Sequence, residues 1–235
     1  MIPRQSVKVQ STTVPDLVAR DGEVQLEVGS VRLSGHLRVP NGATSIVIFV
    51  HGSGSSRHSP RNRYVAQVLN EAGLGTLLFD LLTPDEELDR ANVFDIRLLA
   101  GRLRDVTSWL RDLPGTDDAS LGYFGASTGA AAALWTAAEA DADVGAIVSR
   151  GGRPDLAIPR LAAVRAPTLL IVGGRDLGVL ALNREAQAHL RCPNNLTIVP
   201  GATHLFEERG ALESVAECAR AWFDSWLGAT DARRG

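Results

Sequence analysis

Cysteine is scarce in this chain of 235 residues, and features that mark several classes of protein are missing. The two cysteines, Cys192 and Cys218, make no disulfide framework, and the sequence has no Cys-x-x-Cys pair or metal-ligand spacing. Cys218 lies in a helical pattern and is interpreted as a small buried residue. A formal net charge of -3, without a stripe of Lys and Arg, argues against a dedicated nucleic-acid binder. We therefore expect no metal, no cofactor and no nucleic-acid partner.

Long apolar runs are missing as well. No stretch approaches the ~20 residues that span a bilayer, and residues 1–14 lack the charged start and apolar run of a signal peptide. We therefore expect a cytoplasmic protein with no membrane partner. The composition, 45% hydrophobic and 22% charged, is close to that of an average soluble globular protein. Since α/β folds of roughly 200–250 residues often have a single core, we expect one domain over residues 1–235, with a loosely ordered lead-in at 1–20 and tail at 229–235.

The order of strand and helix patterns predicts the fold class. Residues 23–28 and 31–39 alternate apolar and polar side chains around Gly29-Ser30, which is typical of an antiparallel hairpin. After residue 45, apolar runs alternate with helical periods, which predicts an α/β fold with a mostly parallel sheet and helices on both faces. The expected buried strands are 45–50, 75–79, 121–124, 144–148, 168–172 and 195–199. Apolar spacings of three and four predict helices from near Phe94 to before Pro114 and from near Glu208 to near Gly228.

A serine lies between two glycines where a strand gives way to an alanine-rich helical stretch. The run Gly125-Ala126-Ser127-Thr128-Gly129 has the G-x-S-x-G pattern, which in a strand–turn–helix setting is typical of a nucleophile elbow. Such a turn holds the serine in a strained conformation, and a Cβ at position 125 or 129 would collide with a neighbouring strand or helix. The helix N-terminus favours negative charge developing there. We interpret Ser127 as a catalytic nucleophile; a turn serine that only caps the helix is the alternative.

A serine hydroxyl is a poor nucleophile unless a base lies within hydrogen-bond reach. Of the five histidines, His204 lies in the loop between the last strand and the last helix. That loop emerges at the carboxyl edge of the sheet, as the elbow does. We expect His204 to be the base, and a surface loop histidine is the alternative.

An acid is expected between the serine and the histidine in chain order. Asp176 follows the strand ending at residue 172 and so reaches the same edge of the sheet. It would hold the imidazole tautomer and stabilise the imidazolium. Asp155, after the preceding strand, competes for this role, while Glu207 is too close in sequence to His204 to be favoured.

Backbone N–H groups are needed to stabilise an oxyanion. We expect one from Thr128, the residue after the nucleophile, and another from the turn after the third strand. In that turn, His51-Gly52-Ser53-Gly54, Ser53 is the first choice and Gly54 the second. His51 is expected to be a structural hydrogen-bonding residue beneath the turn.

These features together resemble the α/β-hydrolase superfamily over nearly the whole chain. The short form without a cap domain resembles the dienelactone hydrolase family. Enzymes of that type usually carry cysteine at the elbow, whereas this chain has Ser127, which favours a serine esterase-like mechanism over dienelactone as the substrate. The runs 51–63 and 149–155 also resemble a subgroup sometimes fused to a phosphoribosyltransferase domain. This sequence has no acidic pair followed by a Gly/Thr-rich phosphate loop, so we find no such second domain in it.

The resemblance and the loops at the catalytic edge bear on the substrate. In this fold a lid enters after the sixth strand, where residues 149–167 leave room for one short helix, so we expect an open site unlike that of an interfacial lipase. Arginine binds carboxylate or phosphate through two parallel hydrogen bonds. The candidate substrate-binding residues for a small anionic ester or thioester are Arg57, Arg61, Arg150 and Arg153. Alternatively, these arginines are solvated or pair with Asp85, Glu86, Glu87 and Asp89.

The sequence therefore predicts a serine hydrolase that cleaves a small carboxylic ester, thioester or lactone through an acyl-enzyme on Ser127. Amidases, acyltransferases and perhydrolases use the same three side chains, and the sequence does not separate them. Two further alternatives are a ligand-binding protein on a hydrolase fold, with single or no turnover, and a partner subunit of a phosphoribosyltransferase. The expected partner is a small-molecule substrate, and a homo-oligomer is left open.

Overall fold

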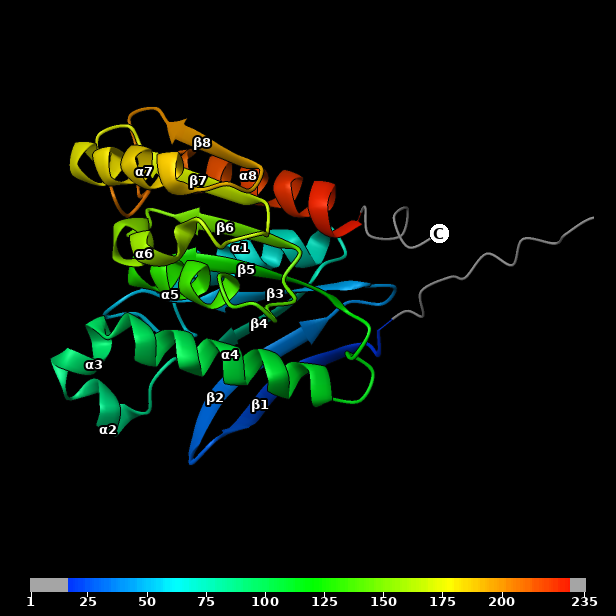
Figure 1. Ribbon diagram of the computed structural model, residues 1–235. Coiled ribbons are helices and arrows are strands. Elements are labelled where there is room, and N and C mark those ends of the chain that lie inside the picture. Colours follow the sequence, from blue (N-terminus) through cyan, green and yellow to red (C-terminus); the bar gives the residue numbers. More distant parts are fainter. Residues whose placement is uncertain (1–16, 229–235) are drawn as a thin grey trace, which may run out of the picture.

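The apolar runs of the sequence become the strands of one sheet in the computed structural model, which describes residues 17–228 (Figure 1). The strands are β1 Arg20–Val28, β2 Val31–Val39, β3 Ser45–Val50, β4 Gly75–Phe79, β5 Ser120–Ala126, β6 Ala146–Arg150, β7 Thr168–Gly173 and β8 Asn194–Val199. Their order across the sheet is β1-β2-β4-β3-β5-β6-β7-β8. The hairpin β1–β2 is antiparallel and joins β4 in antiparallel fashion, while all later pairs are parallel. This is the predicted α/β-hydrolase architecture with its leading hairpin.

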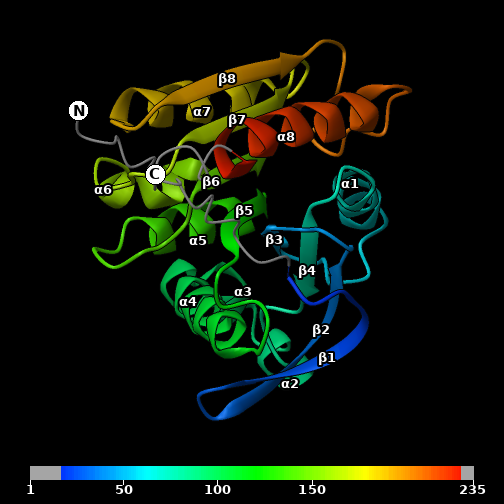
Figure 2. The ribbon, with the colours of Figure 1, turned by 90° about the vertical axis from the view of Figure 1, so that its right-hand side faces the viewer.

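Helices cover both faces of the sheet because the central strands are apolar on both sides. The helices are α1 Pro60–Glu71, α2 Pro84–Glu87, α3 Arg90–Phe94, α4 Ile96–Asp112, α5 Thr128–Ala137, α6 Ile158–Leu161, α7 Leu177–His189 and α8 Ala211–Leu227, with a 3-10 turn η1 at Pro154–Ala157. One core cluster packs beneath α1 and α8, and the other packs beneath α4 and α5 (Figure 2). Within residues 17–228, none of the helices combines the length and apolar composition that a bilayer crossing requires.

Several boundaries differ from those that the apolar pattern predicts. The helix expected from near Phe94 is α4, which begins two residues later at Ile96, because Asp95 is outside the helical conformation and its carboxylate accepts hydrogen bonds from the amides of Arg97 and Leu98. The strand expected at 144–148 is Ala146–Arg150. It therefore includes two polar residues that an apolar count excludes but that are buried here, Ser149 and Arg150.

The described part of the lead-in is more firmly held than the sequence suggests. The Leu17 amide donates to the Ala43 carbonyl at 3.0 Å, and the Val18 amide donates to the Gly115 carbonyl at 3.2 Å. Leu17 is buried and Arg20 begins β1, so a loosely ordered lead-in extending to residue 20 is wrong for residues 17–20. Residues 1–16 and the tail at 229–235 lie outside the described residues.

The carboxyl ends of the parallel strands face one edge, where the loops carry the candidate site residues. Between β6 and β7 the chain holds only η1 and α6, of 4 residues each. The described chain therefore has no cap domain at this position, as the short 149–167 segment predicts.

Candidate active site

Ser127 lies in a strained turn between β5 and α5. Its φ of 50° and ψ of -121° are outside the regions that a residue with a side chain ordinarily occupies. The turn is held from both sides, since the Ser127 amide donates to the Arg150 carbonyl at 3.3 Å and the Ser127 carbonyl accepts from the Arg153 amide at 3.0 Å. These bonds hold Ser127 in the strained conformation that is expected for an elbow.

Glycines surround the turn because neighbouring backbone leaves no room for a side chain. A Cβ on Gly125 would lie 2.5 Å from the Ala130 Cα, and one on Gly129 would lie 2.1 Å from the Val50 carbonyl oxygen. The collisions predicted at these two positions are therefore present. Gly52 has a similar role that the sequence did not reveal, because a Cβ there would lie 2.8 Å from the Ser127 Cβ.

His204 and Asp176 meet at the same edge of the sheet. The His204 Nδ1 lies 2.7 Å from the Asp176 Oδ2, although the two residues are 28 positions apart in the chain. Gly173 makes this approach feasible, because a Cβ there would lie 2.5 Å from the Ala202 carbonyl oxygen in the histidine loop. The Nδ1–H donates to the carboxylate, which leaves the Nε2 atom as an acceptor.

The histidine ring lies beside the loop after β6, which adjoins the elbow. A Cβ on Gly151 would lie 3.5 Å from the His204 Cε1. Within the described residues, Ser127 Oγ and His204 Nε2 form no hydrogen bond. In unliganded enzymes such bonds are often long and shorten only when substrate is bound.

The competing carboxylates have other partners. Asp155 accepts two hydrogen bonds from the Arg153 guanidinium, at 2.8 Å and 2.8 Å. Glu207 pairs with Arg61 at 3.3 Å. Asp176 is thus the carboxylate that the structure brings to His204.

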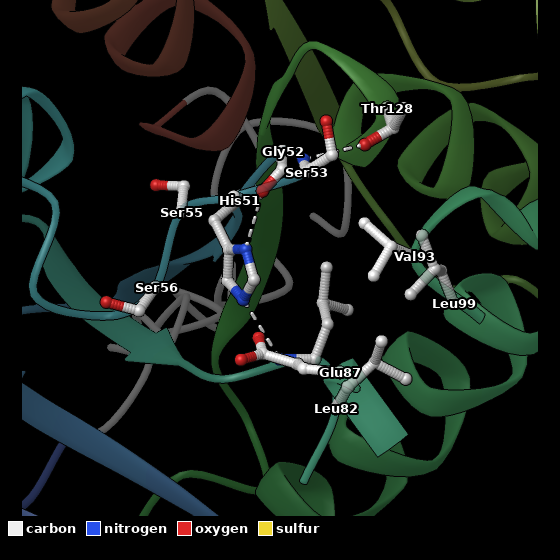
Figure 3. Close-up of a pocket in the computed structure, with 12 residues that line it drawn as sticks. His51, Gly52, Ser53, Ser55, Ser56, Leu82, Glu87, Val93, Leu99 and Thr128 are labelled. Atoms are coloured by element: carbon white, nitrogen blue, oxygen red, sulfur yellow. Dashed lines mark hydrogen bonds between the residues drawn. The ribbon is translucent and has the colours of Figure 1, made fainter. Parts of the chain in front are cut away.

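The two loops expected to supply oxyanion donors meet through a hydrogen bond between them. The Ser53 amide donates to the Thr128 Oγ1 at 3.0 Å (Figure 3). The sequence suggested the Ser53 amide as a free donor, and it missed the Thr128 hydroxyl as its partner. Gly54 follows with a φ of +68°, which keeps the turn tight. Thr128 begins α5, where first-turn amides have no acceptor within the helix.

His51 lies beneath this turn with both ring nitrogens bonded to backbone. Its Nδ1 donates to the Gly52 carbonyl at 3.0 Å, and its Nε2 accepts from the Leu81 amide at 3.0 Å. Burial lowers the pKa of His51, so the ring is neutral. These contacts fit the structural role that the sequence suggests for it.

A cavity of about 380 Å³ opens beside the two donor loops. Ser53 and Thr128 lie at one end of it, and Leu82 and Glu87 lie at the other (Figure 3). The remaining wall is mixed, with Leu81, Val93 and Leu99 on its apolar side and His51, Ser55 and Ser56 among its polar residues. This space can take a small uncharged group next to the elbow.

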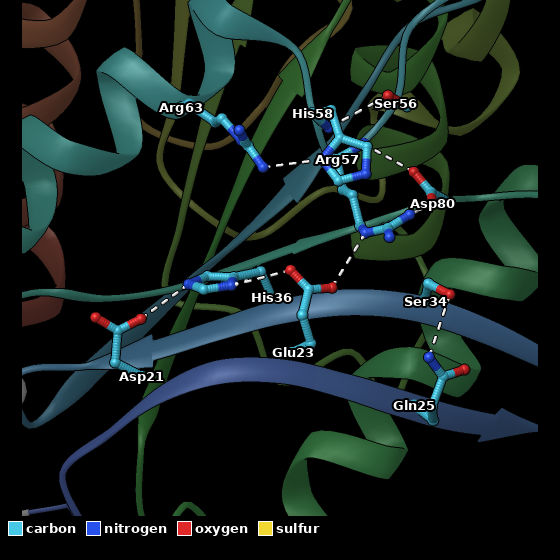
Figure 4. Close-up of polar contacts among 10 residues, drawn as sticks. All are labelled: Asp21, Glu23, Gln25, Ser34, His36, Ser56, Arg57, His58, Arg63 and Asp80. Carbon is cyan, nitrogen blue, oxygen red and sulfur yellow. Dashed lines mark hydrogen bonds and ion pairs between the residues drawn. The ribbon is translucent and has the colours of Figure 1, made fainter.

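The four candidate arginines differ in their partners. Arg57 pairs with Asp80 and with Glu23 of the hairpin (Figure 4), and Arg153 pairs with Asp155. The suggested pairing with residues 85–89 is wrong for all four. Glu86, for example, pairs with Arg102, and its carboxylate also accepts the Thr83 amide at the start of α2. Arg150 is buried, and its side chain has no carboxylate partner among the described residues.

Comparisons with known proteins agree with this architecture, although no family model matches the chain. The crystal structure of a dienelactone hydrolase from Anabaena variabilis is 57% identical in sequence and superposes with a TM-score of 0.86. The alignment covers 88% of this chain and 98% of that one. The chain belongs to the dienelactone hydrolase family of α/β-hydrolases.

Other members and neighbours extend the comparison. A Mycobacterium tuberculosis protein named "Putative phosphoribosyl transferase" is 64% identical over 204 residues, which is 87% of this chain and 46% of that protein. The chain thus spans about half the length of that curated relative. Est1E from Butyrivibrio proteoclasticus shares the fold at 16% identity, with a TM-score of 0.75 and coverage of 87% of this chain and 98% of that one.

Proposed function

We propose that this chain is a serine hydrolase of small carboxylic esters, thioesters or lactones, with Ser127 as nucleophile, His204 as base and Asp176 as the orienting acid. The observation that carries the proposal is the pairing of a strained Ser127 with a His204–Asp176 hydrogen bond of 2.7 Å at the same sheet edge. Membership of a hydrolase family supports the reaction type.

The chemistry follows from the tautomer that Asp176 selects. With the Nδ1–H donated to the carboxylate, the His204 Nε2 can accept the Ser127 proton as Oγ attacks the substrate carbonyl. The imidazolium that forms is stabilised by the Asp176 charge. The bond between the carbonyl carbon and the leaving oxygen then breaks, and Nε2 returns the proton to that oxygen. A water molecule, deprotonated by His204, then releases the acyl group from Ser127.

The oxyanion of the tetrahedral intermediate would receive the Thr128 amide and an amide of the 53–54 turn. Each such donor is worth about 3 kcal/mol of transition-state stabilisation. Because the Ser53 amide donates to the Thr128 Oγ1, the oxyanion would have to share or displace that bond. The Gly54 amide is the second donor that the same turn can supply.

The length of the mycobacterial relative suggests how its name relates to this chain. This chain aligns with 46% of that protein. The elbow and its partner residues Asp176 and His204 lie in this chain. We propose that the transferase activity named for the relative belongs to the part of that protein outside the match. This chain would then hydrolyse esters without transferring phosphoribosyl groups.

Steady-state kinetics with 4-nitrophenyl acetate and 4-nitrophenyl butyrate test the hydrolase proposal. We expect turnover by the wild type, a burst of nitrophenol no larger than one equivalent per chain, and loss of turnover in Ser127→Ala. Ser225→Ala, an exposed serine of α8, is the matched control and should behave as wild type. A well-folded wild type that turns over neither ester, or a Ser127→Ala variant that retains turnover, would contradict the proposal.

A further inference from the structure

Arg150 is a buried cation with no carboxylate partner within residues 17–228. The side chain is 9% exposed, and its Nε and Nη1 atoms are buried without hydrogen-bond partners. Burial, together with the nearby charge of Arg61, lowers the pKa of Arg150 to about 10. Removing a guanidinium from water without a compensating charge is strongly unfavourable. Such an arrangement persists most readily where a ligand supplies the missing charge.

Two of the other candidate arginines have a carboxylate to compensate their charge, although the Arg57 Nε is itself buried without a hydrogen-bond partner. Arg57 and Arg153 each have a carboxylate close to the guanidinium. The charge of Arg61 acts on Arg150, and the carboxylate partner of Arg61 among residues 17–228 is Glu207 at 3.3 Å, whose side chain is 65% exposed. Exposed pairs of this kind are weak. Two neighbouring arginines with so little compensating charge are suited to binding an oxyanion.

The position of Arg150 places its backbone next to the elbow and its guanidinium near the histidine loop. Its carbonyl accepts the Ser127 amide at 3.3 Å, and its guanidinium lies 6.0 Å from the centre of the Phe206 ring. Phe206, two residues after His204, has a φ of 55°, a conformation that a phenylalanine adopts only when its surroundings impose it. Arg150 is therefore on the side of Ser127 from which the histidine loop approaches.

The cavity lies on the opposite side of the nucleophile. The strand order is β4-β3-β5-β6, so Ser127 after β5 separates the cavity at the ends of β3 and β4 from Arg150 at the end of β6. A leaving oxygen must reach His204 to be protonated, which directs the leaving group towards Arg150. The acyl group is then directed towards Leu81, Val93 and Leu99, where the carboxylate of Glu87 disfavours a second anion.

We propose that Arg150, with Arg61, binds an anionic group, carboxylate or phosphate, on the leaving-group side of the ester, while the cavity takes an uncharged acyl group. This inference rests on the proposed serine hydrolase. The substrate would be an ester of a short neutral acid with an anionic alcohol or phenol. The sequence alone did not distinguish Arg150 from Arg57 and Arg153.

Butyrate esters that differ only in the leaving group test this assignment. The set comprises the butyrate esters of 4-hydroxybenzamide, which is neutral, and of 4-hydroxybenzoate and 4-hydroxyphenyl phosphate, which are anionic. A second pair, 4-nitrophenyl hemisuccinate and 4-nitrophenyl butyrate, tests the effect of an anion on the acyl side. We expect the wild type to prefer at least one anionic leaving group by tenfold or more in kcat/KM over the amide, mainly through KM. The better of the two anionic esters identifies the anion as carboxylate or phosphate. The hemisuccinate should be the poorer substrate of its pair.

Arg150→Met should abolish that preference, because methionine fills similar volume without charge. Arg150→Lys should restore part of it, and Arg184→Met, an exposed arginine of α7, should keep the wild-type ratio. An unchanged ratio in a folded Arg150→Met, or a preference for the hemisuccinate, would overturn the inference and leave the Ser127 hydrolase standing. If the wild type turns over none of these esters, the hydrolase proposal itself is overturned.

Calorimetry gives a second readout, in which the binding of phenyl phosphate and of benzoate to the wild type is compared with their binding to Arg150→Met. We expect weaker binding in Arg150→Met, and equal binding would contradict the subsite.

Discussion

Two histidines at the carboxyl edge of the sheet, His51 and His204, show how surroundings decide what an imidazole can do. His51 follows β3 and is 6% exposed, and both of its nitrogens are bonded to backbone groups. His204 follows β8, its side chain is 42% exposed, and one nitrogen is bonded to the carboxylate of Asp176. Protonating His51 would break the bond from the Leu81 amide, and no carboxylate is bonded to the ring to offset the charge. Protonating His204 places the charge beside an anion.

The comparison teaches that a catalytic histidine is recognised by its partners. Both residues lie near Ser127 in the fold, but only His204 has the combination of an anionic partner and a nitrogen that is free to exchange a proton among the described residues. The following variants test that distinction, in order of decreasing expected effect.

Replacing His204 should have the largest effect on catalysis. His204→Ala removes the base and should lower kcat for 4-nitrophenyl acetate by about 10⁵-fold to 10⁶-fold, with little change in Tm because the ring is 42% exposed. His189→Ala, on an exposed histidine at the end of α7, should leave kcat unchanged. If His204→Ala keeps kcat within tenfold of wild type, the assignment of the base is wrong.

Removing only the charge of the acid should have the next largest effect. Asp176→Asn keeps the volume but favours the wrong imidazole tautomer, so kcat should fall by about 10⁴-fold. Asp155→Asn is the matched control, because that carboxylate pairs with Arg153 rather than with His204. A larger loss of kcat in Asp155→Asn than in Asp176→Asn would reverse the roles of the two acids.

His51 should affect stability more than chemistry. His51→Ala leaves the Leu81 amide and the Gly52 carbonyl without their side-chain partner, so the free energy of unfolding should fall by about 2–4 kcal/mol. Urea denaturation measures this loss. An unchanged unfolding free energy, accompanied by complete loss of turnover in the folded variant, would mean that His51 acts in catalysis.

The pH dependence of stability sharpens the same contrast. The pKa of His51 in the folded protein lies below 6.5, the value expected for the unfolded chain, because burial disfavours the charged ring. Below pH 6.5 the unfolded state binds a proton that the folded state does not, so stability decreases as the pH falls. The difference in unfolding free energy between wild type and His51→Gln should therefore be smaller at pH 5.5 than at pH 7.5. A difference independent of pH would contradict the neutral, buried state of His51.

The elements were predictable because the local signals agree with one another. Buried strands such as Ser45–Val50 and Gly75–Phe79 are unbroken apolar runs between turn residues, and their bounds match the structure. Boundaries set by single side chains were not predictable. Asp95 ends one helix and caps the next through its own carboxylate, and no apolar period records that event.

The pairing of Asp176 with His204 was predictable from the sequence, but the partners of the arginines were not. The positions of Ser127, Asp176 and His204 after strands place them on one edge from sequence alone. The partners of the arginines depend on three-dimensional approach. Arg57 meets Asp80 after β4 and Glu23 on β1, and neither is near it in sequence. That Arg150 has no carboxylate partner within residues 17–228 likewise follows only from the fold.

The central claim is that Ser127 is activated by His204, and covalent labelling tests it most directly. The protein is incubated with a fluorophosphonate probe, and the modified residue is located by peptide mass spectrometry in the wild type, Ser127→Ala and His204→Ala. The account predicts stoichiometric labelling at Ser127, no labelling in Ser127→Ala and much slower labelling in His204→Ala. Labelling of a different residue, or none in a well-folded wild type, would contradict it.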